Sequence, residues 1–85
     1  MSRKGKLISR LLERPKDFTW REARTLMSQC GFELKSGSSG SARMFIHGTS
    51  KLKIRLHEPH PRKTLLPYMI GELINALTET GDIEE

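Results

Sequence analysis

Three histidines could carry acid–base chemistry in this chain: His47, His57 and His60. An imidazole titrates close to neutral pH, so a well-placed histidine can take up or release a proton during a reaction. Cleavage of RNA without a metal needs a base for the 2′-hydroxyl, an acid for the leaving oxygen and a cation for the charged transition state. Lysine and arginine supply the cation, and the chain has 15 of them.

His57 and His60 are the candidate catalytic residues. His57 ends a run of alternating apolar and polar residues, so its ring is expected to face outward beside Arg55. His60 lies between two prolines in what should be a rigid loop. Each has a plainer interpretation, a solvated surface side chain for His57 and a structural loop residue for His60. His47 is expected to be an ordinary strand-end residue, because antiparallel pairing places it nearer the start of the following strand than His57.

A segment rich in glycine and serine, residues 35–41, is expected to be a loop that could bind phosphate. Small residues let backbone N–H groups approach a phosphate closely, and the guanidinium of Arg43 adds positive charge. Gly40, Ser41 and Arg43 are therefore candidate RNA-binding residues. The alternative is a flexible hairpin loop without a ligand.

A second candidate RNA-binding surface is the polar side of residues 51–57, where Lys51, Lys53 and Arg55 alternate with apolar residues. This alternation predicts a strand whose cations face away from the core. Such a row could bind the sugar–phosphate backbone of RNA. It could equally be a solvated sheet face whose charges prevent aggregation through strand edges.

The overall charge favours a polyanionic partner. Fifteen lysines and arginines against ten acidic residues give a net charge of +5. Nucleic acid is the commonest polyanion in a cell, although the charge could serve solubility alone.

The chain shows no signature of a metal site, a disulfide or a membrane span. No cysteine–histidine cluster has zinc-binding spacing, so neither a metal nor a cofactor is predicted. The single cysteine, Cys30, lies on an apolar helical face and is expected to be a buried core thiol. No apolar run is long enough for a signal peptide or a transmembrane helix, so a reducing cytoplasm is the expected location.

Two helices are expected before the strands. Apolar residues recur at helical spacing over residues 4–13. Thr19 and Glu22 fit a capping box that begins a second helix, because each side chain can bond the other residue's backbone N–H. Gly31 should end this helix in a left-handed conformation.

Three strands and a last helix follow. Strands are expected over residues 32–35, 43–47 and 51–57, and the last helix should be capped by Thr64 and end at Gly81. A three-stranded antiparallel meander with one solvated face needs helices on its other face. The prediction is an α+β fold of order α-α-β-β-β-α, a two-layer sandwich of the meander packed on helices, in one domain spanning residues 1–85.

Two stretches resemble the HicA family of mRNA-cleaving toxins. Residues 40–45, Gly-Ser-Ala-Arg-Met-Phe, are similar to the family's Gly-Ser-His-x-x-Phe segment entering the second strand. Residues 57–61, His-Glu-Pro-His-Pro, are similar to its Pro-His-Pro-containing segment before the last helix. The element order also resembles the double-stranded-RNA-binding domain. The resemblance covers roughly residues 19–83 by element order, so residues 1–17 are expected to be an extension relative to the short family form.

This resemblance implies the toxin of a type II toxin–antitoxin pair, a metal-independent mRNA endoribonuclease neutralised by a HicB-like antitoxin. One position departs from the family pattern, because the histidine read as catalytic is replaced here by Ala42. Either the chemistry lies elsewhere in this chain, or the protein is a catalytically inactive member. Two further functions therefore stay open: a non-catalytic RNA-binding module of the same fold, and an interaction protein that docks an acidic partner through its basic face.

Overall fold

The computed structural model describes residues 3–36, 40 and 42–84. Its elements are α1 (Arg3–Leu12), α2 (Trp20–Gln29), β1 (Phe32–Ser36), β2 (Ala42–His47), β3 (Lys53–His57) and α3 (Pro67–Glu79). The predicted order and the α+β class are confirmed.

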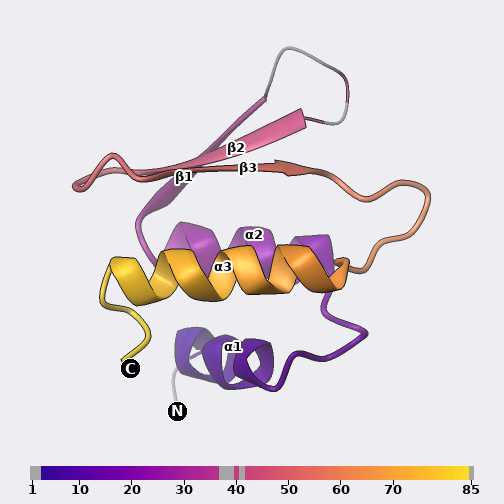
Figure 1. The fold of residues 1–85 in the computed structure, drawn as a ribbon, viewed down its shortest axis with the longest axis horizontal. Helices are drawn as coiled ribbons and strands as arrows, with labels where there is room; N and C mark the ends of the chain where they lie inside the picture. Colours follow the sequence, from indigo (N-terminus) through magenta and orange to yellow (C-terminus); the bar gives the residue numbers. More distant parts are fainter. Residues whose placement is uncertain (1–2, 37–39, 41, 85) are drawn as a thin grey trace.

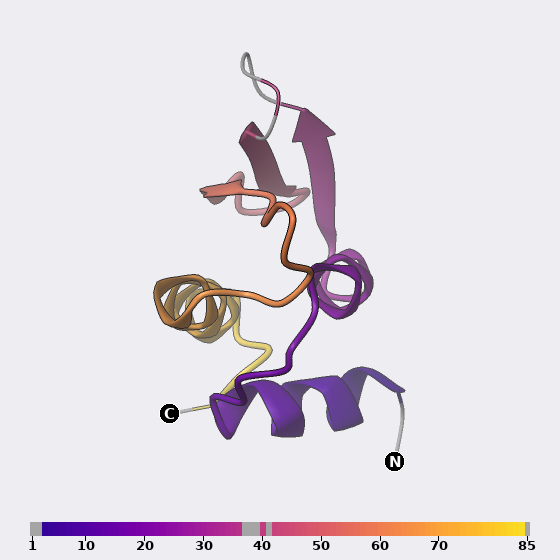
Figure 2. The ribbon, with the colours of Figure 1, turned by 90° about the vertical axis from the view of Figure 1, so that its right-hand side faces the viewer.

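The sheet and the helices lie in stacked layers. The three strands are antiparallel, in the order β1-β2-β3. Helices α2 and α3 lie side by side against one face of the sheet, and α1 packs on the far side of this helix pair (Figures 1 and 2). No described helix covers the other face of the sheet, which we call the outer face.

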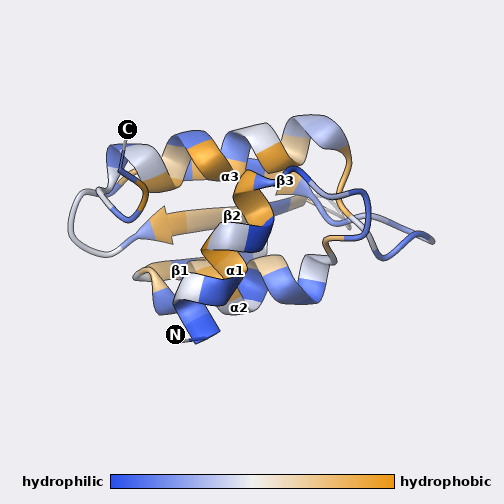
Figure 3. Ribbon diagram, turned by 90° about the horizontal axis from the view of Figure 1, so that it is seen from below, coloured by the Kyte–Doolittle hydropathy of each residue, from blue (hydrophilic) through white to orange (hydrophobic). Residues whose placement is uncertain are grey.

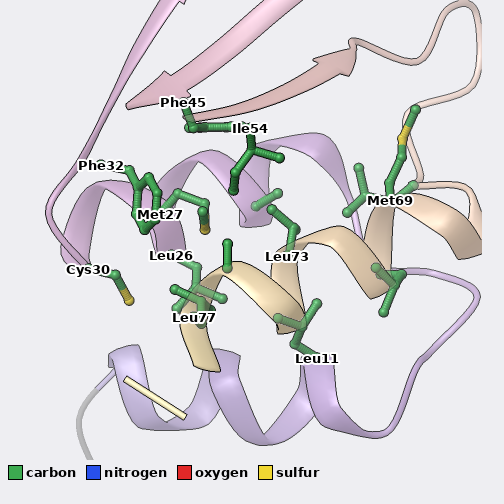
Figure 4. Close-up of a cluster of buried hydrophobic side chains, with 14 of the residues drawn as sticks. Leu11, Leu26, Met27, Cys30, Phe32, Phe45, Ile54, Met69, Leu73 and Leu77 are labelled. Carbon is green, nitrogen blue, oxygen red and sulfur yellow. The ribbon is translucent and has the colours of Figure 1, made fainter. Parts of the chain in front are cut away.

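One hydrophobic core runs through these layers. Phe45 and Ile54 reach down from the sheet to meet the buried side chains of α2 and α3 (Figure 4). Helix α1 crosses beneath α2 and α3 (Figure 3) and adds Leu7 and Leu11 to the same cluster. Leu11 is fully buried, so α1 contributes to the core of the domain.

The start and end of α2 follow from local chemistry. The Thr19 hydroxyl accepts the Glu22 N–H at 3.1 Å, and the Glu22 carboxylate accepts the Thr19 N–H at 3.0 Å, which confirms the capping box. Gly31 follows the helix with a φ of +88°, as predicted. A β-carbon there would lie 3.3 Å from the His47 ring, so only glycine fits comfortably. The chain therefore turns directly from α2 into β1.

Two boundary predictions are wrong. Thr64 does not cap α3: it pairs with Thr19 in an isolated antiparallel bridge, and Leu66 precedes the helix without any side-chain cap. Lys51 does not begin β3: it lies in the hairpin turn with a φ of +64°, and its N–H donates to the His47 carbonyl at 3.0 Å. Alternation in the sequence cannot reveal that a residue has left the ladder for a turn, so β3 begins two residues later than predicted.

Ion pairs connect α1 to other segments of the fold. Lys4 Nζ lies 2.9 Å from Asp82 Oδ1, which joins α1 to the segment after α3. Arg10 bonds both Asp17 and the capping residue Glu22. These contacts add to the packing of Leu11 and fix where α1 sits.

The Lys4–Asp82 pair should make stability depend on pH. Burial raises the pKa of Asp82, but hydrogen bonds from Lys4 and Thr80 and the charge of Lys4 outweigh it and bring the pKa below 3.8. A carboxyl group whose pKa is lower in the folded than in the unfolded protein stabilises the fold at pH values above its unfolded-state pKa. This contribution is lost as the pH falls through its folded-state pKa. Asp82→Asn should therefore cost up to about 1 kcal/mol near neutral pH, and the difference should shrink as the pH is lowered through 3.8. Urea unfolding across this range measures it, and a pH-independent difference would contradict the assignment.

Candidate active site

A pocket of about 340 Å³ lies at one end of the sheet, lined by Gly40, Arg43, Glu58 and His60. We call it the end pocket. Its position follows from the strand register. Arg43 pairs with Leu56, so the start of β2 lies beside the end of β3. The chain leaving β3 then carries Glu58 and His60 past Arg43.

Arg43 is held in the end pocket by three contacts. Its Nη1 donates to the carbonyl oxygens of Gly40 at 2.8 Å and Ala42 at 2.9 Å. Its Nε lies 3.3 Å from Glu58 Oε1, and the two side chains are 24% and 41% exposed. The guanidinium is therefore oriented by the protein yet stays within reach of a ligand from solvent.

The end pocket combines an imidazole, a carboxylate and a guanidinium, which are the groups that metal-free phosphodiester cleavage needs. Of the two histidines predicted to be catalytic, only His60 lines this pocket. Glu58 was not among the predicted residues. The sequence could have indicated Glu58, because successive side chains of a strand point to opposite faces of the sheet. If His57 faces outward, Glu58 points to the other face, which also carries Leu56 and its partner Arg43.

His57 lies on the outer face, at the end of β3. Its register partner is Ala42, the position where the family resemblance expects a histidine. Directly opposed residues in an antiparallel pair have β-carbons about 4.5–5.5 Å apart. His57 is therefore the histidine directly opposite Ala42 on the neighbouring strand. It does not line the end pocket, where His60 lies.

The cations predicted to bind RNA do not form one surface. Lys53 and Arg55 are exposed on the outer face, where Arg55 is opposite Met44. Lys35, which was not among the predicted RNA-binding residues, lies opposite Met44 on the neighbouring strand β1 and extends this basic surface across the sheet.

The other predicted RNA contacts lie elsewhere. Lys51 is exposed in the hairpin turn. Arg43 is in the end pocket with Gly40, on the face opposite Lys53. Ser41 lies outside the described residues. The periodicity of a single strand could not predict this separation, because it arises from the pairing of two strands.

His47 has a structural environment. Its Nδ1 accepts the backbone N–H of Ser50 at 3.1 Å, and its ring contacts the Phe32 ring at 5.0 Å between centroids. These contacts fix the β2–β3 turn, in keeping with the expected strand-end role.

Cys30 is buried, as predicted. Burial is the largest cause that raises the pKa of its thiol, the charge of Asp82 adds to this, and Lys4 opposes it, with a resulting value of about 11. The thiol is therefore protonated at neutral pH and is a poor nucleophile.

A larger hollow, of about 740 Å³, opens between α2 and β1 and includes Arg21 and Arg24. Its lining has one carboxylate, Glu33, and no histidine, so it lacks the imidazole that the end pocket has. Within the described residues, no group of three or more histidine, cysteine or acidic side chains is arranged to hold a metal ion. No helix among the same residues is both long and apolar enough to cross a membrane.

A family model, described as HicA toxin of bacterial toxin-antitoxin, matches residues 20–78. The matched range begins at the first residue of α2 and includes the whole sheet, the end pocket and nearly all of α3. It leaves α1 outside. No curated protein and no solved structure matches the chain. Since the matched residues make up well over half of the sequence, the chain belongs to the HicA family of toxins from bacterial toxin–antitoxin systems.

Proposed function

We propose that this chain is the toxin of a type II toxin–antitoxin pair, that it cleaves mRNA without a metal, and that a HicB-like antitoxin neutralises it. Membership of the HicA family supports the role of toxin. The observation that carries the activity is the end pocket, because Arg43, Glu58 and His60 supply a cation, a base and an acid within one small space.

The proposed reaction uses each group once. The Glu58 carboxylate takes the proton of the ribose 2′-hydroxyl, and the 2′-oxygen forms a bond to phosphorus. The bond from phosphorus to the 5′-oxygen breaks, and protonated His60 gives its proton to that oxygen. Arg43 stabilises the negative charge on the phosphoryl oxygens. The products are a 2′,3′-cyclic phosphate and a 5′-hydroxyl.

The phosphate must replace Glu58 as the partner of Arg43. The Nε–Oε1 distance is 3.3 Å and both side chains are partly exposed. Such a pair contributes only about 0–1 kcal/mol, so a phosphate can open it at little cost. Opening the pair also frees the Glu58 carboxylate to act as a base.

The outer face is the proposed surface for the RNA chain beyond the cleaved bond. Lys53 and Arg55 are exposed there and suit contacts to the sugar–phosphate backbone. Gly40 remains a proposed phosphate contact beside Arg43 in the end pocket. Lys51, in the hairpin turn at the other end of β2, remains a proposed contact to the RNA backbone, and so does Ser41, which is outside the described residues. Binding through these cations should weaken steeply with added salt.

Ala42 favours a second candidate function, a non-catalytic RNA-binding module of the same fold. The family resemblance places a histidine at this position, and its nearest histidine across the strands is His57. Catalysis in the family could depend on a histidine on the outer face, at the position of Ala42. If His57 does not act in its place, the protein binds RNA without cleaving it. A third candidate, docking of an acidic partner through the basic face, requires no affinity for RNA.

Purified protein incubated with mRNA in EDTA separates these functions. We expect cleavage by the wild-type protein. Binding without cleavage, with activity gained in Ala42→His, would instead identify an inactive copy. No binding at physiological salt would leave the third candidate. Expression in cells adds an independent readout: growth should stop, and co-expression of a HicB-like antitoxin should restore it.

A further inference from the structure

A second pocket lies where the chain before α2 meets the start of α3. The connection between α1 and α2 runs beside the segment before α3, and the Thr19–Thr64 bridge holds the two together (Figure 1). Between them is a cavity of about 310 Å³, here called the junction pocket. Part of its lining comes from residues 14–16, which lie outside the range matched by the HicA family.

The floor of the junction pocket is aliphatic. Its apolar lining consists of Pro15, Leu65, Pro67 and Ile70. Leu65 and Ile70 belong to the buried core, so the floor is rigid. A nucleic-acid base is normally held by stacking on aromatic rings, and this lining has none. The floor suits the aliphatic or aromatic anchor side chain of a protein.

The rim of the junction pocket is basic. Its polar lining consists of Arg14, Lys16 and Arg62, with no carboxylate. In the described part of the chain, none of these three side chains has an ion-pair partner, in contrast to Lys4, Arg10 and Arg43. The α3 N-terminus, which has no side-chain cap, adds its positive dipole nearby.

Arg14 also has an unusual backbone. Its φ is +52°, in the left-handed region that glycine adopts most easily. Glycine would suit this turn after α1, yet the position carries a long cationic side chain at the pocket rim. Arg14 therefore adds a third cation to the rim, beside Lys16 and Arg62.

We propose that the junction pocket binds an acidic segment of a partner protein, with one apolar side chain of that segment in the pocket and its carboxylates on Arg14, Lys16 and Arg62. This step rests on the proposed function, under which the antitoxin is the protein that brings the segment. The occupant is a protein segment because the floor offers an aliphatic anchor site and no aromatic ring.

A peptide titration of the full chain tests the proposal. The probe is a blocked Glu-Glu-Leu-Glu-Glu peptide, followed by backbone amide NMR shifts. We expect the largest shifts at Lys16, Leu65 and Ile70. A peptide with serine in place of leucine should bind at least about fivefold more weakly, because it lacks the anchor.

Matched variants locate the site. Lys16→Glu with Arg62→Glu should weaken peptide binding at least about tenfold. Arg3→Glu with Lys6→Glu makes the same change in net charge on exposed residues of α1 and should change affinity less than about twofold. Arg14→Gly suits the backbone and should keep the thermal midpoint while weakening binding about threefold.

Equal losses in both double variants, or shifts centred elsewhere, would overturn the proposal. Tighter binding of a five-nucleotide uridine RNA at the same residues would overturn it too, in favour of an RNA site. The mRNA cleavage assay does not depend on peptide binding, so failure of this proposal and failure of the proposed function are distinguishable.

Discussion

Replacing His60 by alanine should lower the rate of mRNA cleavage by about 100-fold to 10,000-fold, the usual contribution of a general acid. His60 is the only histidine that lines the end pocket of the described structure. Binding of RNA should stay within about threefold of wild type, because the cationic contacts remain. Single-turnover cleavage with protein in excess separates the chemical step from binding and measures the effect.

His57→Ala is the matched control for this variant. It removes the same side chain three residues earlier, on the outer face and outside the end pocket. We expect a loss of less than about tenfold, because a contact to the RNA backbone is lost without loss of a proton donor. The opposite ranking, with His57→Ala inactive and His60→Ala active, would move the catalytic site to the outer face beside Ala42 and refute the end pocket.

Leu11→Ala should lower the free energy of unfolding by about 2–5 kcal/mol, the range for emptying a fully buried leucine site. Leu11 is 0% exposed and lies against the helix pair, although α1 is outside the range matched by the HicA family. Small domains have only roughly 5–15 kcal/mol in total, so this one change should remove much of the stability. Urea unfolding followed by circular dichroism measures the difference.

The neighbouring residue provides a control on the same helix. Leu12 is 48% exposed, and Leu12→Ala should change the free energy of unfolding by less than about 1 kcal/mol. Similar, small effects of both substitutions would show that α1 does not contribute to the core in solution.

Much of the fold could be predicted from local patterns. The Thr19–Glu22 capping box depends on residues three positions apart, so the sequence displays it directly. Period-two alternation likewise predicted the central part of β1 and β3, and Gly31 predicted the end of α2. These features depend on chemistry within a few residues.

The two wrong boundaries have different causes, one a contact between distant segments and the other a local turn. Thr64 resembles a helix cap, but its segment pairs instead with the chain at Thr19, 45 positions earlier in the numbering. Lys51 continues an alternating run, but the hairpin turn takes it out of the ladder. The Thr64 prediction failed because its pairing partner is distant in the sequence, whereas the Lys51 prediction failed because alternation continues unchanged through a local turn.

The candidate site could also be predicted only in part from the sequence. The types of its residues were visible in the sequence, and His60 and Arg43 were both selected from it. Their meeting with Glu58 depends on the register of β2 against β3, which brings Arg43 opposite Leu56. Register also places Arg43 on the opposite face of the sheet from Lys53 and Arg55, so the two candidate RNA-binding surfaces named from the sequence lie on different faces.

The chemical form of the RNA ends is the most direct test of the proposed chemistry. Wild-type protein should be incubated with a defined mRNA fragment in EDTA, and the products analysed by mass spectrometry. Attack by the 2′-hydroxyl in the end pocket predicts 2′,3′-cyclic phosphates and 5′-hydroxyls. Intact RNA, or fragments that end in 3′-hydroxyls and 5′-phosphates, would contradict it.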